Sequence, residues 1–216
     1  MDQKLQTILV QKILQHIDAG TTQLADETYA NPVSNYTSRD QLSKEINVLF
    51  RQQPLLVGLS CQLPELGDFL TFDYTGVPLL VVRGQDGAVR SFLNVCRHRG
   101  ARVAEGHGNT RKRFRCPYHG WSYDTNGRLV GIPDKQSFSG VDRSTCGLVP
   151  MPVAESDGMI WTCATPAETN VKSTKLDIQH QLAGLGPELR SYNVANYHHY
   201  ASRALYLKMN WKLVID

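Results

Sequence analysis

Up to Pro54 the spacing of hydrophobic residues predicts two amphipathic helices. Gly20 ends the first, and Ser38 with Gln41 three residues later forms a capping box at the start of the second. Two helices of this length cannot enclose a core alone, so we expect both to pack against the region that follows. The apolar residues are Leu5, Ile8, Leu9, Ile13 and Ile17 in the first helix and Leu42, Ile46, Leu49 and Phe50 in the second.

From about Pro54 to Thr165 the pattern changes to short β-rich runs separated by turn residues. The stretch VPLLVVRGQDGAVRSFLNV predicts a hairpin that turns at Gly84–Gly87, and WSYDTNGRLVGI predicts another with Asn126-Gly127 at its turn. The stretch GMIWTCA predicts a closing strand. Many short strands with glycine-rich turns indicate an antiparallel sandwich or a small barrel.

The remaining residues, 166–216, show a mixed pattern. KLDIQHQLAGLGPELRSY predicts a short helix and loop, and YHHYASRALYLKMNWKLVID predicts a strand that enters a helix at its end. Two adjacent histidines, His198 and His199, would point to opposite faces of that strand, so we interpret them as structural. The fold class is therefore mainly β with N-terminal helices, in the α+β class.

Composition excludes several classes of protein. A hydrophobic content of 41% and a charged content of 20% are ordinary for a globular protein, and a net charge of +3 does not favour nucleic-acid binding. The N-terminus has no basic region of a signal peptide, and the longest apolar run, Val77–Val82, is too short to span a bilayer. Five cysteines at irregular spacing make a poor disulfide framework, so we expect a cytoplasmic location.

Two cysteines and two histidines form the most informative motif. Cys96-x-His98 is followed, after Arg99 to Arg115, by Cys116-x-x-His119, and each half is expected at a hairpin tip. A Rieske [2Fe–2S] centre needs this set, because two thiolates hold one iron and two imidazoles hold the other. Gly100 and Gly120 would let backbone amides approach the cluster. Zinc remains an alternative, although common zinc fingers order their ligands Cys, Cys, His, His; a Cys96–Cys116 disulfide is disfavoured in a reducing compartment.

The sequence around these residues resembles a known family. NVCRHRGARV and RCPYHGWSYDTNGRL are similar to the cluster-binding boxes of the large (α) subunit of Rieske non-haem iron ring-hydroxylating oxygenases. PLLVVRGQDGAVRSFLNVC resembles the strands before the first box, and NWKLVID resembles the segment that opens the catalytic site. The resemblance implies a helical segment over 1–52, a Rieske β-sandwich domain over 53–165 and a truncated start of the α+β catalytic domain over 166–216.

The resemblance also implies a function. The chain would take electrons from a ferredoxin or an NADH-linked flavin reductase and pass them to a mononuclear Fe(II) that activates O₂ to hydroxylate an aromatic or related substrate. The ligands of that iron are expected beyond this sequence, so no catalytic residue is assigned and the chain alone is expected to be inactive. The full-length protein would be a homotrimer or an α3β3 assembly, without nucleic-acid or membrane partners. A stand-alone Rieske-type ferredoxin is the alternative.

Other residues of the boxes bear on the reduction potential and the donor. Ala101 and Tyr118 stand where high-potential Rieske proteins carry a second disulfide-bonded pair of cysteines, and Trp121 stands in place of a serine that bonds a bridging sulfide. Fewer hydrogen bonds to sulfur lower the potential, so we expect about −150 mV. His107 is expected to be a bystander. Basic residues could dock an acidic donor: Arg97, Arg99, Arg102, Arg111, Lys112, Arg113 and Arg115.

Overall fold

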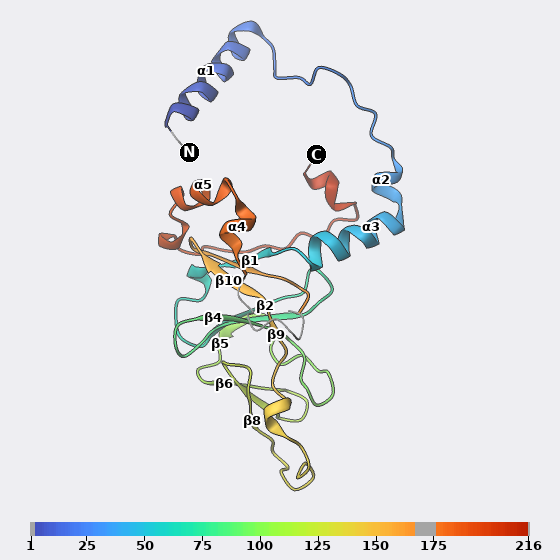
Figure 1. Ribbon diagram of the computed structural model, residues 1–216, viewed down its shortest axis with the longest axis vertical. Coiled ribbons are helices and arrows are strands. Elements are labelled where there is room, and N and C mark those ends of the chain that lie inside the picture. Colours follow the sequence, from blue (N-terminus) through green and yellow to red (C-terminus); the bar gives the residue numbers. More distant parts are fainter. Residues whose placement is uncertain (1–2, 167–175, 216) are drawn as a thin grey trace.

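The computed structural model describes residues 3–166 and 176–215. Its strands form three antiparallel sheets, stacked along the long axis of the molecule below the helices (Figure 1). The central sheet has the order β5-β2-β3-β4-β9 and is built from His107–Asn109, Asp68–Phe72, Leu79–Arg83, Val89–Leu93 and Pro150–Met151.

Two three-stranded sheets lie on either side of the central sheet (Figure 1). The sheet nearer the helices has the order β1-β11-β10 and is formed by Leu55–Leu59, Met159–Thr162 and Val153–Ser156. The sheet at the far end has the order β6-β7-β8 and is formed by Arg113–Arg115, Ser122–Asp124 and Leu129–Gly131. The predicted antiparallel sandwich and both predicted hairpins, β3–β4 and β7–β8, are confirmed.

Strand β3 connects two parts of the core. All four residues Leu79–Val82 are fully buried, because neighbouring strands flank β3 and both of its faces are covered. Leu80 and Val82 pack with the residues around the two cysteine–histidine boxes, whereas Val81 packs with Leu63 and Ile160 on the opposite face. The apolar run in the sequence therefore marks the strand that both layers share.

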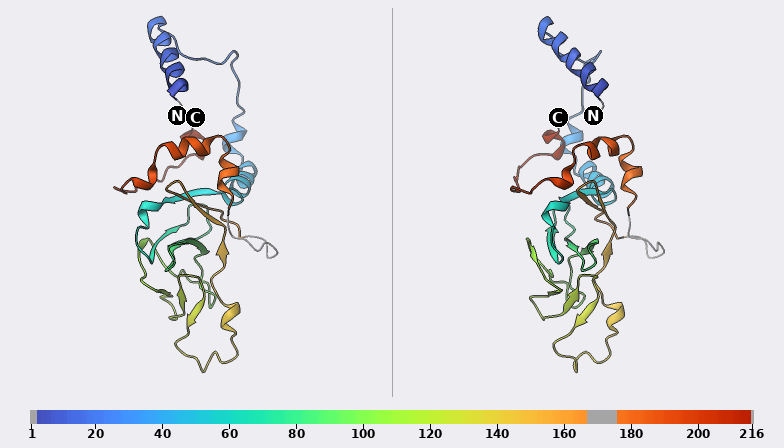
Figure 2. Two further views of the ribbon diagram at one scale, coloured as in Figure 1. Left: turned by 60° about the vertical axis from the view of Figure 1, so that its left-hand side comes forward. Right: turned by 90° about the vertical axis from the view of Figure 1, so that its left-hand side faces the viewer.

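The first predicted helix forms, but its predicted packing is wrong. Helix α1 spans Gln3–Ala19, ends before Gly20 with φ at +61°, and contains no buried residue. It stands away from the body at the end of an extended segment in every view (Figures 1 and 2). Its apolar stripe is exposed, with Leu5 at 47% and Ile17 at 66% of their accessible area.

The second predicted helix lies against the body. A short helix α2, Ser34–Thr37, precedes α3, Arg39–Glu45, which continues as a π-helical turn over Ile46–Arg51. The backbone N–H of Gln41 donates to the Ser38 hydroxyl over 3.3 Å, which confirms the N-cap. The side chain of Gln41 does not complete the capping box, because it donates to Glu45 instead.

Residues 176–215 contain helices but no paired strand. Helices α4, Ile178–Leu182, and α5, Leu185–Ser191, replace the single short helix predicted, whose first residue, Lys175, lies outside the described residues. The stretch 197–209 runs without a sheet partner among the described residues, so the predicted strand is not formed there. Its predicted helical end is the 3₁₀ turn Trp211–Val214, and the last predicted residue, Asp216, is not described.

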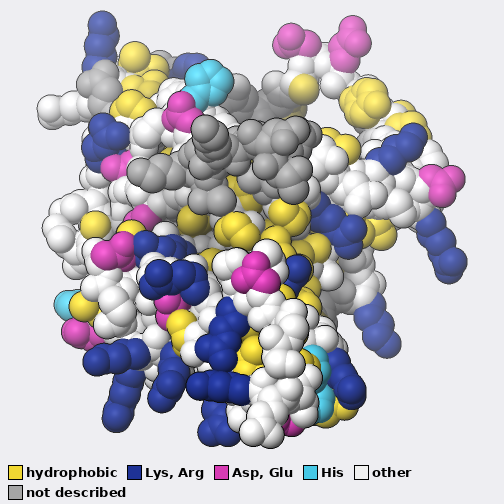
Figure 3. All heavy atoms as spheres, turned by 60° about the horizontal axis from the view of Figure 1, so that its bottom comes forward, with side chains coloured by type: hydrophobic (Ala, Val, Ile, Leu, Met, Phe, Trp, Pro, Cys, Tyr) yellow, Lys and Arg dark blue, Asp and Glu magenta, His cyan; other side chains and the backbone are white. Residues whose placement is uncertain are grey.

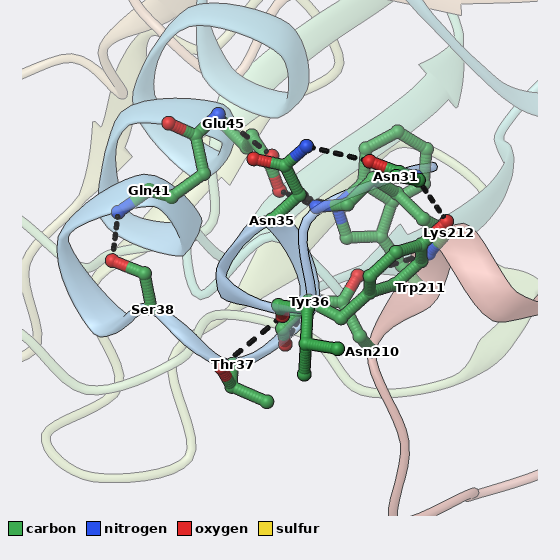
Figure 4. Close-up of polar contacts among 11 residues, drawn as sticks. Asn31, Asn35, Tyr36, Thr37, Ser38, Gln41, Glu45, Asn210, Trp211 and Lys212 are labelled. Atoms are coloured by element: carbon green, nitrogen blue, oxygen red, sulfur yellow. Dashed lines mark hydrogen bonds and ion pairs between the residues drawn. The ribbon is translucent and has the colours of Figure 1, made fainter. Parts of the chain in front are cut away.

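The buried carboxylate of Glu45 links helix α3 to the C-terminal turn. Glu45, 8% exposed, accepts hydrogen bonds from the Trp211 indole N–H over 2.9 Å, from Lys212 Nζ over 2.7 Å and from Gln41 over 2.9 Å (Figure 4). Asn210 donates to the backbone carbonyl of Tyr36. These bonds lower the pKa of Glu45 from 4.5 to about 2, with the Lys212 bond as the largest cause.

The described part of the chain contains no helix with the length and apolarity needed to cross a membrane.

This network predicts an acid-sensitive attachment of the C-terminal turn. Because the folded pKa of Glu45 is lowered, its contribution to stability is present above pH 4.5 and is lost as the pH falls toward about 2. NMR of the indole N–H groups should show Trp211 losing protection from hydrogen exchange over that range, with Trp161 as internal reference. Glu45→Ala should remove the protection of Trp211 at neutral pH, and Glu45→Gln should reduce it. Unchanged protection of Trp211 in Glu45→Ala would contradict this assignment.

Candidate metal centre

The two cysteine–histidine boxes adopt the same backbone turn. In the first, the N–H of Cys96 donates to the carbonyl of Ala101 over 2.8 Å and that of Gly100 donates to Cys96 over 2.9 Å. In the second, Cys116 donates to Trp121 over 2.8 Å and Gly120 donates to Cys116 over 3.0 Å. The glycines have φ of +76° and +70°, which explains why both boxes carry glycine at this position. The second box lies at the tip of the β6–β7 hairpin, as predicted. The first box lies between β4 and β5, which do not pair with each other, so the predicted hairpin tip is wrong there although the turn is equally tight.

The four predicted side chains form two pairs, Cys96 with Cys116 and His98 with His119. Cys96 and Cys116 are 3% and 2% exposed, and both thiols are free. The rings of His98 and His119 lie edge to face with centroids 4.6 Å apart. Burial, followed by the neighbouring Cys116 thiol and opposed by the Tyr123 hydroxyl, raises the pKa of the Cys96 thiol. The set therefore divides into a cysteine pair and a histidine pair.

The imidazoles present unused nitrogens to the site. Nδ1 of His98 and Nδ1 of His119 are both buried and have no hydrogen-bond partner. Burial lowers the pKa of His98, and the charges of His119 and Arg99 lower it further, so the neutral form that binds metals is favoured. Two buried thiols beside two unpartnered nitrogens fit a two-iron cluster with two Cys and two His ligands.

A single-ion site is not assembled from these residues. Within residues 3–166 and 176–215 no three His, Cys, Asp or Glu side chains converge closely enough to hold one metal ion. The arrangement in two pairs suits two iron atoms better than one tetrahedral zinc ion. His107 lies apart from the four, exposed on strand β5, where it pairs with Leu70 of β2.

Aromatic rings enclose one of the two histidines. Trp121 is 3% exposed and stacks on His98 with ring centroids 5.0 Å apart and an interplanar angle of 8°. Phe138 contacts the edges of both rings, with centroids 5.2 Å from His98 and 5.4 Å from Trp121. Phe138 comes from a loop with no motif, so no sequence pattern indicated its contact with the site. Together these rings shield His98 from water.

The second histidine has a more open surrounding. Tyr118 is 59% exposed, and its ring centroid is 3.7 Å from that of His119. Among the described residues, the rings in contact with His119 are those of His98 and Tyr118, and no buried apolar ring encloses it as Trp121 encloses His98. The open side of the site is therefore at His119 and Tyr118.

The hydroxyl of Tyr123 makes two contacts that the sequence did not reveal. Its ring is fully buried, and its hydroxyl oxygen accepts the backbone N–H of Arg97 over 3.0 Å. The same hydroxyl lies 3.2 Å from Sγ of Cys96, so it can donate its proton to a thiolate there. Tyr123 therefore both fixes the first box and contacts one sulfur ligand.

The side chain of Asn94 fixes the backbone that follows the first box. Its side chain is 1% exposed, and its amide oxygen accepts the backbone N–H groups of Val103 over 2.9 Å and Ala104 over 3.2 Å. Its amide nitrogen donates to the carbonyl of Ala104 over 2.8 Å. A single side chain thus satisfies three backbone groups of the chain that follows the box.

We predict that Asn94→Ala destabilises the protein by about 2–4 kcal/mol, since buried backbone groups lose their partners. Urea unfolding followed by circular dichroism measures this difference. Asn126→Ala is the matched control, because Asn126 is exposed at the β7–β8 turn; this variant should stay close to wild type. Equal midpoints for Asn94→Ala and wild type would show that the clamp is dispensable.

Comparison with known proteins agrees with this geometry. The family described as "Rieske [2Fe-2S] domain" matches residues 53–152. Biphenyl 2,3-dioxygenase subunit alpha of Rhodococcus jostii is 37% identical over 172 residues, which cover 76% of this chain and 37% of that protein. The glycine betaine monooxygenase oxygenase subunit of Pseudomonas aeruginosa is 29% identical over 191 residues, covering 88% of this chain and 43% of that protein.

A solved structure agrees in fold. The quaternary ammonium Rieske monooxygenase CntA in complex with L-carnitine superposes with a TM-score of 0.77 at 24% identity, covering 88% of this chain and 53% of that chain. The chain spans about half or less of the length of these three proteins. Residues 53–152 are therefore a Rieske [2Fe–2S] domain, and the chain corresponds to the N-terminal region of Rieske oxygenase α subunits.

Proposed function

We propose that Cys96, His98, Cys116 and His119 hold a Rieske [2Fe–2S] cluster, and that the chain is the electron-transfer part of a Rieske oxygenase. The observation that carries the proposal is the pairing of two buried free thiols with two buried, unpartnered imidazole nitrogens. Such a cluster, when bound, accepts and releases one electron at a time. Cys96 and Cys116 would ligate one iron through Sγ, and His98 and His119 the other through Nδ1.

The surrounding residues would serve this function in different ways. Trp121 and Phe138 exclude water from the His98 side, which limits access of solvent and oxygen. Tyr123 would donate a hydrogen bond to the Cys96 thiolate, and His119 lies against the exposed ring of Tyr118. We infer that electrons pass through the His119 side.

The complete protein would use these electrons at a second metal. We infer a mononuclear Fe(II) in the remainder of an oxygenase subunit, where O₂ is activated to hydroxylate an aromatic or related organic compound. Residues 1–52 would then be a helical segment, 53–165 the Rieske domain and 166–216 the start of the catalytic domain. A homotrimer or an α3β3 assembly and a cytoplasmic location are part of this proposal; all five cysteines are unpaired, as in reducing compartments.

The similarity outside the Rieske domain favours an oxygenase over a stand-alone ferredoxin. The alignment to the glycine betaine monooxygenase subunit covers 88% of the chain, well beyond residues 53–152. The segment from Asn210 to Lys212 is bonded to Tyr36 and Glu45 of the N-terminal helices, an arrangement that a compact electron carrier does not need.

An acidic ferredoxin or reductase is the donor that the surface favours. The seven basic residues of the boxes and of the chain between them are all exposed. Among the described residues only Arg102 of this group forms an ion pair, with Asp73 over 2.8 Å. An unneutralised basic surface beside the candidate cluster attracts an acidic protein at low ionic strength.

Iron and acid-labile sulfide analysis tests the ligand assignment. The purified protein, reconstituted anaerobically, should contain iron and sulfide in equal amounts and give the electron paramagnetic resonance spectrum of a reduced Rieske centre. Cys96→Ser, Cys116→Ser and His98→Ala should each lose the cluster. His107→Ala is the matched control and should keep it, because His107 lies outside both boxes. Zinc without sulfide in the wild-type protein would contradict the proposal.

We predict that Tyr123→Phe lowers the reduction potential of the cluster by about 30–60 mV, because a hydrogen bond to a thiolate favours the more negative, reduced state. The wild-type value is expected near −150 mV, at the low end of the Rieske range. Potentiometric titration followed by the paramagnetic resonance signal measures both values. A potential that is unchanged in the variant, with the signal intact, would show that the hydroxyl does not act on the sulfur.

A further inference from the structure

A half-buried arginine and a buried hydroxyl lie together where the N-terminal helices meet the sheets. We propose that the Arg51 guanidinium and the Thr75 hydroxyl form a binding site for the carboxylate of a small organic acid. The site joins the π-helical turn Ile46–Arg51 to the turn between β2 and β3. Figures 1 and 2 show α3, which the π-helical turn continues, ending beside the strands. The inference does not depend on the metal centre.

The side chain of Arg51 covers the turn between β2 and β3. Its Nε and Nη2 atoms donate to the carbonyl oxygen of Thr75 over 3.4 and 3.5 Å. A Cβ atom at Gly76, whose φ is +75°, would lie 3.5 Å from Nη2, so the guanidinium passes close to the turn backbone. Thr75 is 9% exposed although Tyr74 and Gly76 on either side of it are exposed, as expected for a residue that lies beneath this arginine.

The hydroxyl of Thr75 has no partner within the protein. Its Oγ1 atom is buried and forms no hydrogen bond. A hydroxyl that has lost its bonds to water is unfavourable in the interior unless another polar group replaces them. Thr75 therefore offers a buried donor to an oxygen atom of a ligand.

The guanidinium of Arg51 has bonding capacity that the protein does not use. Its hydrogen bonds are long, two to Thr75 and one of 3.2 Å from Nη1 to Oδ1 of Asn47. Bonds from arginine to a carboxylate are usually about 2.7–2.9 Å long, and the planar guanidinium can make two of them in parallel. A small movement of this side chain would therefore admit a carboxylate between the guanidinium and the Thr75 hydroxyl.

Acidic residues of the same elements are paired with other groups. Within residues 3–166 and 176–215 Arg51 forms no ion pair. Glu45, which directly precedes the π-helical turn, is bonded to the C-terminal turn, and Asp73, in the turn between β2 and β3, pairs with Arg102 over 2.8 Å. The half-buried charge of Arg51 has no counter-charge in the described chain, which favours a ligand of opposite sign.

The chemistry of the two groups selects a small carboxylate. A carboxylate is planar and accepts two parallel bonds from a guanidinium and a further bond from a hydroxyl. Because Thr75 is almost fully buried, only a compact acid can bring an oxygen atom to its hydroxyl. The bound carboxylate would bridge the π-helical turn and the sheet, and would thereby fasten the N-terminal helices to the Rieske domain.

Attraction of an acid to the exposed basic surface is a different effect. Lys and Arg side chains gather over the lower part of the face shown in Figure 3, and the basic residues of the two boxes are all exposed. Exposed charges attract any anion, and salt screens that attraction. Binding by Arg51 and Thr75 should instead depend on one buried hydroxyl, so the two effects can be separated.

Titration with sodium acetate at constant ionic strength, with chloride as the balancing anion, tests the site. NMR of the Arg51 Nε–H group should show a saturable shift, with an affinity in the millimolar range because the ligand has so few atoms. Thr75→Val keeps the shape of the side chain and removes the hydroxyl, so it should weaken acetate binding about fivefold or more. Thr75→Ser keeps a hydroxyl and should bind acetate as the wild type does.

A matched arginine variant controls for charge. Arg51→Met should lose the response to acetate. Arg39→Met removes the same charge from an exposed position of α3, so it should respond as the wild type does. Thermal unfolding gives a second measurement, because acetate should raise the unfolding midpoints of the wild type and Arg39→Met but not that of Arg51→Met.

Three outcomes would overturn the site. An acetate affinity of Thr75→Val equal to that of the wild type would show that the hydroxyl takes no part. A response that does not saturate and falls equally in Arg51→Met and Arg39→Met would show attraction to basic charge alone. A lower unfolding midpoint of Thr75→Val than of the wild type, without acetate, would show that the hydroxyl already has a partner such as an ordered water.

Discussion

The central strand β3 is the constraint on which the rest of the structure depends. Its residues Leu79–Val82 are fully buried on two faces, so each face must be covered by its own layer. One layer contains Leu63 and Ile160, and the other contains Cys96 and Trp121. The candidate metal site is therefore part of one of the two cores, and a change in β3 would disturb both the sandwich and the two cysteine–histidine turns.

The candidate site itself follows from the conflict between burial and polarity. Thiols and imidazole nitrogens without partners are costly inside a protein, since burial removes their hydrogen bonds to water. Nδ1 of His98 and Nδ1 of His119 are buried without a hydrogen-bond partner. The backbone groups around them are bonded, through the side chain of Asn94 and through the turns that end at Gly100 and Gly120. Two of the buried side-chain atoms without a partner, Nδ1 of His98 and Nδ1 of His119, are atoms that a metal cluster would use; the other two are Thr75 Oγ1 and Trp161 Nε1.

Much of the arrangement could be predicted from local sequence. The hairpins, the N-cap at Ser38 and the four ligand candidates follow from turn chemistry and spacing, which act between residues close in the chain. The free position of α1 could not be predicted, because an apolar stripe indicates a buried face without saying what covers it. Tyr123 and Phe138 reach the site through long-range packing that no spacing rule encodes. The extended stretch 197–209 has a strand-like pattern but no neighbour among the described residues with which to pair.

The two ligand turns are closed by their own backbone hydrogen bonds, Cys96 with Gly100 and Ala101, and Cys116 with Gly120 and Trp121. These bonds connect backbone groups and include no ligand atom, so the turn and a cluster would use different atoms of the same residues. Each cysteine is held through its backbone, while its sulfur is in no disulfide. Loss of a cluster would remove bonds to sulfur and imidazole but not these backbone bonds, in contrast to small zinc domains in which the metal organises the chain.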